Sequence, residues 1–134
     1  MKNIDHIGIA VKDFNTSIPL FEKLLNTPCF KTEFVETEAV NTAFFQTGES
    51  KIELLQSETD DGVIAKFIEK KGEGIHHIAY DVSDIKAEME RLQKEGFILL
   101  NETPKKGADN KLVCFLHPKS TNGVLIELCQ EIKD

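Results

Sequence analysis

Two histidines and two glutamates occupy matching places in a chain that repeats itself. The repeated segments are IDHIGIAV at 4–11 with IHHIAYDV at 75–82, and KIELLQ at 51–56 with LIELCQ at 125–130. The repeat places His6 opposite His77, and Glu53 opposite Glu127. Two imidazoles and two carboxylates suit a divalent transition metal, and an octahedral ion with four protein ligands keeps open positions for substrate oxygens. The repeat therefore predicts one metal site with ligands from both halves of the chain.

The alternation of side chains along a strand indicates where these four residues point. His6 shares its face with Gly8 and Ala10, whereas the opposite face carries isoleucine and valine. The same holds for His77, and Glu53 and Glu127 point away from their own apolar neighbours. A single histidine or glutamate of this kind is more often structural or solvated than a ligand. Ionisable groups are rarely buried without partners, however, and four recur here within apolar strands. We expect all four to face a shared concavity.

These strands belong to a repeated order of elements. Val11 leads into an amphipathic helix that we expect to begin near Thr16 or Ser17, leaving Pro19 in its first turn. The second helix is expected to begin after Asp84 as N-cap and to stop at Gly96. Further strands are expected at 29–36, 40–47, 51–56, 97–101, 112–117 and 124–130. Each half then reads β-α-β-β-β.

A short connecting helix is expected between the halves, at about 60–72. Asp60 and Asp61 would cap it, and Gly72 would end it. We therefore predict a single α+β domain over 1–134, with module one at about 1–57 and module two at about 74–131.

Composition limits the classes of partner. The chain has 134 residues, 40% of them hydrophobic, and a net charge of −7, which describes an ordinary globular protein and disfavours nucleic acid as a partner. No apolar run approaches the roughly 20 residues that cross a bilayer, and the N-terminus resembles no signal peptide. Cys29, Cys114 and Cys129 are far apart and form no CxxC motif. Reduced thiols in a cytoplasmic protein that binds no membrane are expected.

Other polar residues are candidates for substrate contacts. His76 points away from its neighbour His77 and is expected to be structural, or to support a ligand. His117 lies near the longer loop of module two, where either a substrate contact or a surface turn is consistent with the sequence. The densest positive charge is formed by Lys105, Lys106, Lys111 and Lys119. These lysines either bind phosphates or lie in a solvated loop.

The chain resembles the vicinal oxygen chelate superfamily over nearly its whole length. The segments IHHIA at 75–79, FLHPK at 115–119 and GVLIEL at 123–128 are similar to those of methylmalonyl-CoA epimerases within that superfamily. The resemblance implies two βαβββ modules that form a cupped mixed sheet, the glyoxalase-like fold. It also implies a divalent metal held by His6, Glu53, His77 and Glu127, with Co²⁺ the first choice and Ni²⁺, Mn²⁺ or Zn²⁺ as alternatives.

The activity that this resemblance implies is epimerisation at C2 of methylmalonyl-CoA through an enolate, in propionate metabolism. Glu127 is the expected catalytic base, and His117, Lys119 and Lys111 are the expected substrate-binding residues. Some epimerases carry a second catalytic glutamate on a middle strand of module one, where Thr42 or a neighbouring residue aligns here, and not a glutamate. Glu36 and Glu38 lie close to that position in sequence, so the second base stays open. A homodimer is expected.

Two alternatives share the same fold. Glyoxalase I, acting on the hemithioacetal of glutathione and methylglyoxal, would use the same ligands, and binding of the CoA tail would separate the two activities. A metal-free binding module is disfavoured because such relatives commonly lose ligand residues, whereas this chain keeps all four.

Overall fold

A computed structural model describes residues 1–133 of the chain. Its residues group into two compact units. The first unit contains His6–His76, and the second contains Met1–Asp5 together with residues 77–133. The boundaries fall inside two strands, β1 (Ile4–Ala10) and β5 (Gly74–Asp81). The first residues of the chain therefore belong with the second unit.

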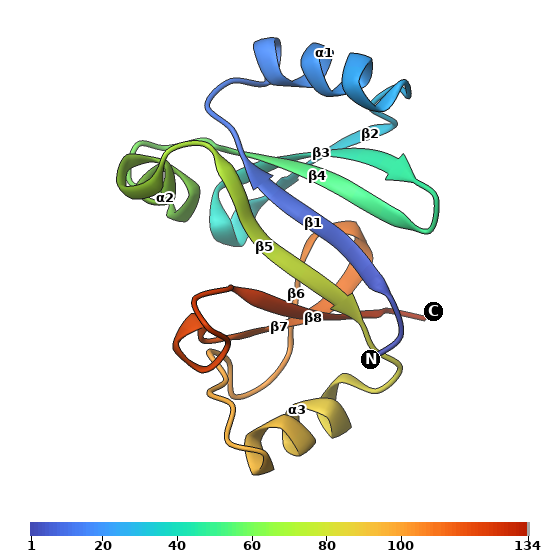
Figure 1. Ribbon diagram of the computed structural model, residues 1–134, viewed down its shortest axis with the longest axis vertical. Helices are drawn as coiled ribbons and strands as arrows, with labels where there is room; N and C mark the ends of the chain where they lie inside the picture. The colour runs from blue at the N-terminus through green and yellow to red at the C-terminus, as the bar shows by residue number, and fades with distance from the viewer. Residues whose placement is uncertain (134) are drawn as a thin grey trace. The chain divides into compact units, whose positions relative to one another are not determined.

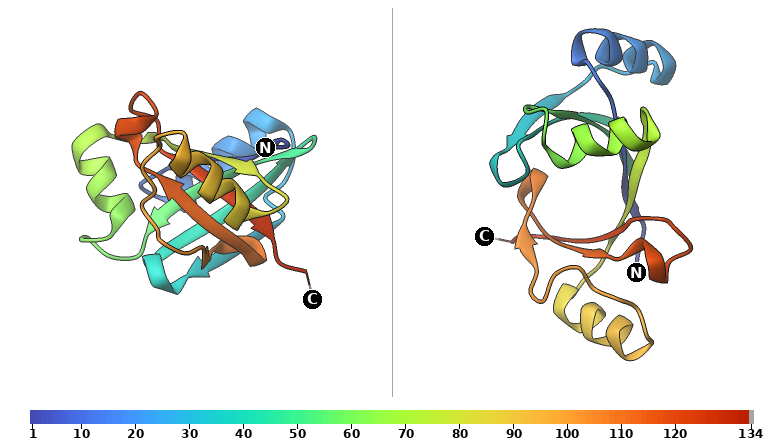
Figure 2. Two further views of the ribbon diagram at one scale, coloured as in Figure 1. Left: turned by 90° about the horizontal axis from the view of Figure 1, so that it is seen from below. Right: turned by 90° about the vertical axis from the view of Figure 1, so that its left-hand side faces the viewer.

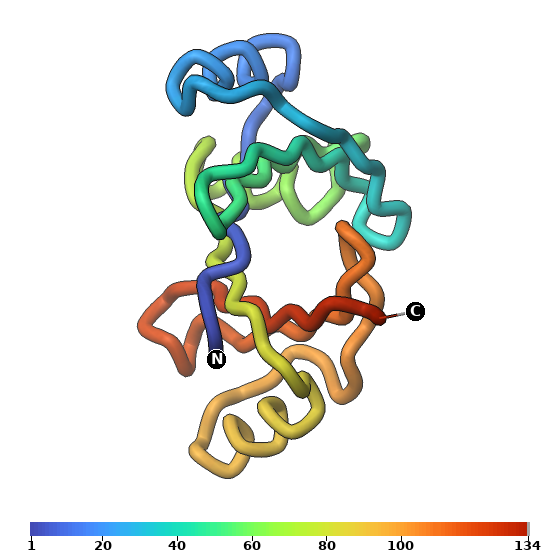
Figure 3. Tube along the Cα trace, turned by 90° about the vertical axis from the view of Figure 1, so that its right-hand side faces the viewer, coloured from blue at the N-terminus to red at the C-terminus, as the bar shows by residue number. Residues whose placement is uncertain are grey.

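The first unit is a mixed four-stranded sheet with one helix on its apolar face and a second helix at one end of the other face. Its elements are β1, α1 (Phe14–Leu25), β2 (Lys31–Val35), a 3₁₀ turn (Glu36–Glu38), β3 (Val40–Thr47), β4 (Ser50–Ser57) and α2 (Val63–Lys71). The strand order is β2-β3-β4-β1, antiparallel except for the parallel pair β1 and β4. Figure 1 labels these elements, and the tube in Figure 3 follows the chain from α1 through β2 to the β3–β4 hairpin.

The second unit repeats this plan. After β5 come α3 (Ile85–Lys94), β6 (Lys105–Lys106), a 3₁₀ turn (Ala108–Asn110), β7 (Lys111–Leu116), a 3₁₀ turn (Pro118–Ser120) and β8 (Ile126–Glu131). The strand order is β5-β8-β7-β6, and β5 and β8 form the parallel pair. Both units thus have the strand–helix–three-strand order predicted from the repeat, and the α+β class is confirmed.

The helices pack where the strand faces are apolar. Ile18 and Phe21 of α1 lie against Phe45 and Leu54 of the first sheet, and Ile85 and Met89 of α3 pack with Leu128 of β8 in the second. Figure 2 shows α3 and α2 from two further directions. The isoleucine and valine faces of β1 and β5 are therefore covered, which leaves the histidine faces for other contacts.

A repeated glutamine fixes the start of each large helix. Gln56 Oε1 accepts a hydrogen bond from the Phe14 backbone N–H at 2.6 Å, and Gln130 Oε1 accepts one from the Ile85 N–H at 2.7 Å. The first N–H groups of a helix have no partner within it, so these side chains satisfy them. The repeat LLQ/LCQ thus serves helix capping as well as the ligand positions.

The first helix begins earlier than the sequence indicated. Asp13 is its N-cap, with its side chain accepting from the Asn15 N–H, and Pro19 lies inside the helix rather than in its first turn. Proline removes one backbone hydrogen bond there, but the contacts of Ile18 and Phe21 with the sheet offset this loss. The prediction for the second helix is confirmed, because Asp84 caps it and Gly96 follows it with φ of 100°.

Two other local predictions are wrong. Gly62, not Asp60 or Asp61, precedes α2, and it provides no side-chain cap. A Cβ at Gly62 would lie 2.6 Å from Ser57 Oγ, so the tight approach of the chain decides this position. Segment 97–101 forms only an isolated bridge between Leu99 and Leu116. The side chain of Asn101 accepts from the Phe115 N–H and so ends the backbone pairing.

Phe45 anchors the core of the first unit. Its side chain is fully buried among α1 and sheet residues. Replacing it with alanine should lower the free energy of unfolding by about 3–5 kcal/mol, since the large cavity cannot fully collapse. Denaturant unfolding would measure this, with Phe34→Ala as control, because Phe34 is 49% exposed. An equal loss in both variants would contradict the assignment of Phe45 to the core.

Candidate metal site and its surroundings

His6 and Glu53 form a close pair in the first unit. Strands β1 and β4 run parallel, with Gly8 opposite Glu53, so that His6 and Glu53 project diagonally from the same face. His6 Nδ1 lies 3.0 Å from Glu53 Oε2, and both residues are buried. Gly8, opposite Glu53, has no side chain that could come between them.

His77 and Glu127 form the equivalent pair in the second unit. Here Ala79 lies opposite Glu127 on the parallel strands β5 and β8. His77 Nε2 lies 3.0 Å from Glu127 Oε1, and both residues are again buried. The Phe115 ring meets the imidazole edge to face, with 5.8 Å between centroids, which restricts its rotation. The repeat in sequence is thus a repeat in geometry within each unit.

Each pair has the geometry of two neighbouring metal ligands. Ligand atoms about 2.1 Å from one ion and at right angles to each other are separated by about 3.0 Å. The same separation is normal for a charge-assisted hydrogen bond, so distance alone fits both descriptions. Burial of an ionisable pair is costly unless its charge is compensated. Duplication of that costly arrangement, with donor atoms that transition metals prefer, fits a bound divalent cation.

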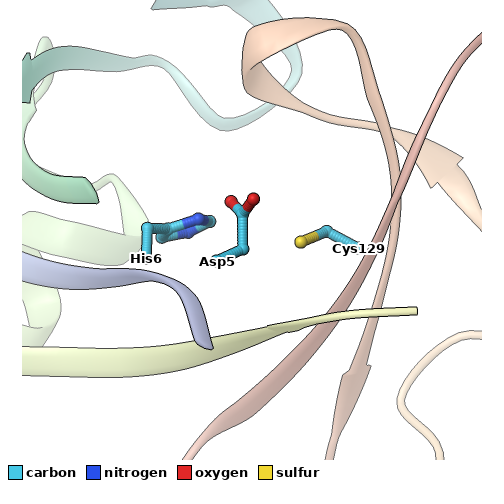
Figure 4. A group of neighbouring side chains, drawn as sticks. All are labelled: Asp5, His6 and Cys129. Atoms are coloured by element: carbon cyan, nitrogen blue, oxygen red, sulfur yellow. The ribbon is translucent and has the colours of Figure 1, made fainter. Parts of the chain in front are cut away.

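Asp5 and Cys129 form a second group of potential ligands, in the second unit. Their ligand atoms lie within 4.8 Å of each other, and Figure 4 shows the Cys129 sulfur pointing toward the Asp5 carboxylate. Burial, reinforced by the charges of Asp5 and Glu127, raises the pKa of the Cys129 thiol far above its usual range. A thiol binds metals as the thiolate, and this environment opposes that form.

The Asp5 carboxylate already has a cationic partner. Lys111 Nζ donates to Asp5 Oδ1 at 3.0 Å, and both side chains are largely buried. Burial alone would lower the pKa of Lys111, but the hydrogen bond and charge of Asp5 outweigh it and the pKa is raised above 10.5. Its contribution to stability is therefore fully present below that pH, and is lost as the pH rises through the higher folded-state pKa. Asp5 and Lys111 are an ion pair at neutral pH.

This ion pair yields a stability prediction. The Asp5→Asn variant leaves Lys111 charged without its partner, and should lower the free energy of unfolding by about 1–3 kcal/mol, between the values for exposed and fully buried pairs. Denaturant unfolding at neutral pH would measure it, with Asp81→Asn as control, because Asp81 pairs with the exposed Lys2. Equal losses in the two variants would show that burial adds nothing to the Asp5–Lys111 pair.

The expected substrate-binding residues lie around β7. Lys111 begins β7 and lies on the same strand face as Phe115. Phe115 is paired with Glu127 of β8, so Lys111 and Glu127 project from the same face of the sheet. His117 caps the following 3₁₀ turn, and its Nδ1 accepts from the Lys119 N–H at 3.0 Å. Lys119 itself is exposed. Lys111 is thus directed inward by Asp5, whereas His117 and Lys119 occupy a surface turn.

The remaining candidates divide by environment. The His76 ring meets Phe67 edge to face at 4.9 Å between centroids, as expected for a structural residue. Thr42 is buried in β3 opposite Leu55, on the sheet face that also carries Glu53. Glu36 and Glu38 lie in the 3₁₀ turn between β2 and β3, where Glu36 is exposed and Glu38 is half-buried. Lys105 and Lys106 form the short exposed strand β6.

Sequence reasoning missed Asp5 and the role of Phe115. Asp5 could have been found from the sequence, because it is a charged residue inside the apolar strand IDHIGIA. A charged side chain that is buried needs a partner. Phe115 gave no such signal, because its contact with His77 depends on the register of β7 with β8.

Comparison with known proteins shows the family to which the chain and its fold belong. A model of the Glyoxalase/Bleomycin resistance protein/Dioxygenase superfamily matches residues 5–115. The chain belongs to this superfamily, and its glyoxalase-like fold is confirmed.

Within this superfamily, several of the similar proteins are named methylmalonyl-CoA epimerases. The chain is 39% identical to the uncharacterized protein YqjC of Bacillus subtilis over 97% of this chain and 93% of that one. It is 38% identical to the ethylmalonyl-CoA/methylmalonyl-CoA epimerase of Cereibacter sphaeroides over 95% and 96%. A solved variant of Streptomyces coelicolor methylmalonyl-CoA epimerase, in complex with 2-nitronate-propionyl-CoA, matches with a TM-score of 0.92 at 32% identity, covering 99% of both chains.

Proposed function

We propose that this protein is a metal-dependent methylmalonyl-CoA epimerase, an isomerase that interconverts the 2R and 2S forms. The observation that carries the proposal is the pair of buried histidine–glutamate contacts, one in each unit, each 3.0 Å long. Similarity to named epimerases over almost the entire chain supports the substrate. No observation favours the glyoxalase I alternative.

The proposed ligands are His6, Glu53, His77 and Glu127. A divalent cation bound by these residues would supply a fixed positive charge that makes the thioester carbonyl more electron-withdrawing. We propose Co²⁺ as the ion, with Ni²⁺, Mn²⁺ and Zn²⁺ as alternatives, since a nitrogen and oxygen donor set accepts each of them. The expected measurement is restoration of activity to chelator-treated protein by each ion in turn, together with metal content.

The residues must move a proton at C2 of the substrate. This carbon lies between a thioester and a carboxylate, so its proton is acidic enough for a carboxylate base in a water-poor site. We propose that Glu127 removes it, because its carboxylate is buried on the strand face of His77 and is held by that side chain. The proton must return on the opposite face of the planar carbanion, which requires a second group. Glu36 and Glu38 remain the candidates for it, along with a residue near Thr42.

Lys111, His117 and Lys119 are proposed to bind substrate. The Lys111 ammonium lies on the face of Glu127 and keeps its charge through Asp5, so it can attract the substrate carboxylate. Lys119 is exposed beside His117, where it can meet a phosphate. We further propose a cytoplasmic homodimer active in propionate metabolism. Three free cysteines support a reducing compartment, and no helix among residues 1–133 could span a membrane.

Deuterium exchange at C2 of methylmalonyl-CoA tests the function directly. We expect Co²⁺-loaded protein in heavy water to exchange the C2 proton rapidly, as followed by NMR, and chelator-stripped protein to lose this activity. Exchange no faster than in buffer, with metal demonstrably bound, would contradict the proposed reaction. Turnover of the glutathione hemithioacetal in the same preparation would then favour the glyoxalase alternative.

A further inference from the structure

The first unit contains a surface groove whose lining residues do not include His6 or Glu53. Its volume is about 480 Å³, and its lining residues come from α2 and the start of β5: Val63, Lys66, Phe67, Glu69, Lys70 and His76. All six belong to the first unit. None is a proposed ligand, base or substrate-binding residue of the epimerase site.

The groove combines an apolar surface with positive charge. Phe67 and His76 meet edge to face at 4.9 Å between centroids, and the Val63 side chain beside them is 52% exposed. Lys66 and Lys70 are one helical turn apart on α2, so both ammonium groups reach the same side. Neither forms an ion pair with a described residue. Glu69 is the one acidic lining residue, so the groove is positive in a chain of net charge −7.

The position of α2 relates the groove to the first half of the proposed site. Ile64 and Phe67 of α2 pack against Ala10 and Leu55, which lie on the sheet face of His6 and Glu53. Ala10 lies four positions after His6 along β1, a distance of about 13 Å. A substrate with its reacting head at His6 and a long arm toward α2 would therefore bring its far end to the groove.

We propose that this groove binds the phosphorylated nucleotide end of the acyl-CoA substrate. Lys66 and Lys70 contact its phosphates, and the adenine ring lies against the apolar surface of Phe67, His76 and Val63. Phosphates prefer clustered lysines and arginines, and a flat base prefers an aromatic surface. This assignment rests on the proposed function for its substrate, but its binding test does not require turnover.

The test uses the full-length Lys66→Gln/Lys70→Gln variant loaded with Co²⁺. KM for methylmalonyl-CoA should rise roughly five- to tenfold with kcat unchanged, the loss expected for two exposed ion pairs. The N-acetylcysteamine thioester of methylmalonate, which lacks the nucleotide, should show the same KM with variant and parent. Lys23→Gln is the matched control, because Lys23 is likewise exposed in the last turn of a helix, α1.

Calorimetry with 3′,5′-ADP separates failure of this proposal from failure of the proposed function. Binding that weakens five- to tenfold in the double variant, and not in Lys23→Gln, supports the groove even if the parent protein turns over no substrate. Unchanged binding in the double variant overturns the proposal, as does an equal rise in KM for the full and the truncated substrates. Absence of 3′,5′-ADP binding to the parent protein overturns it as well.

Discussion

Glu127→Gln should lower kcat for C2 epimerisation by about 10²–10⁴-fold, the usual contribution of a positioned base. The amide keeps the shape of the carboxylate and an oxygen donor, but it cannot accept the C2 proton. The buried Glu127 lies 3.0 Å from His77 and opposite Phe115, so a glutamine of similar shape should occupy the same space. Deuterium exchange and metal content, measured on the same sample, separate loss of the base from loss of the ion.

The control for this variant is Glu131→Gln. Glu131 is four residues further along β8 on the same strand face, but it is exposed. Its replacement should leave kcat within about twofold, as for an ordinary surface change. If Glu127→Gln retained exchange with its metal bound, Glu127 would be a ligand only and the base would have to be sought elsewhere.

His77→Ala is expected to have the second large effect, on metal binding. Loss of supporting residues around a metal ligand already weakens affinity 10–100-fold, so removal of a ligand should cost at least about 100-fold, and activity should fall with occupancy. The change also leaves the buried Glu127 carboxylate without its imidazole partner. Titration with Co²⁺ followed by its absorption spectrum would measure affinity, and excess Co²⁺ should restore part of the activity.

His76→Ala provides the matched control one residue away. Its ring packs on Phe67 rather than on a glutamate, so this variant should keep the parent affinity for Co²⁺ and lose some stability. Similar Co²⁺ affinities for His76→Ala and His77→Ala would contradict the assignment of His77 as a ligand. His6→Ala should behave like His77→Ala, because its pairing with Glu53 has the same 3.0 Å separation.

Local signals and the repeat made several features predictable. Asp84 and Gly96 mark the ends of α3 because capping chemistry is local. Strand 40–47 coincides with β3. Alternation along a strand placed His6 and His77 on the faces opposite those that α1 and α3 cover, because side chains alternate between the two faces of any strand. The sequence repeat then indicated that His6 and Glu53 are equivalent to His77 and Glu127. The repeat did not give the distance between histidine and glutamate in either pair.

Other features depended on partners distant in the chain. The failure of segment 97–101 as a strand depends on Asn101 accepting from the Phe115 N–H, and the start of α1 depends on Gln56 as well as Asp13. Lys111 could have been a solvated loop lysine by sequence alone, whereas Asp5, 106 residues away, directs it inward. Helix propensity and charge pattern contain no information about such partners.

The sequence by itself determined the two βαβββ modules and the four candidate ligands, because periodicity, capping and repetition are properties of nearby residues and of their alignment. The tertiary structure decided the strand register, which brings His6 to Glu53 and His77 to Glu127 within each unit. It also decided the Asp5–Lys111 pair and the groove beside α2. These features arise when segments far apart in the chain come into contact, and side-chain atoms then meet over distances that sequence spacing does not specify.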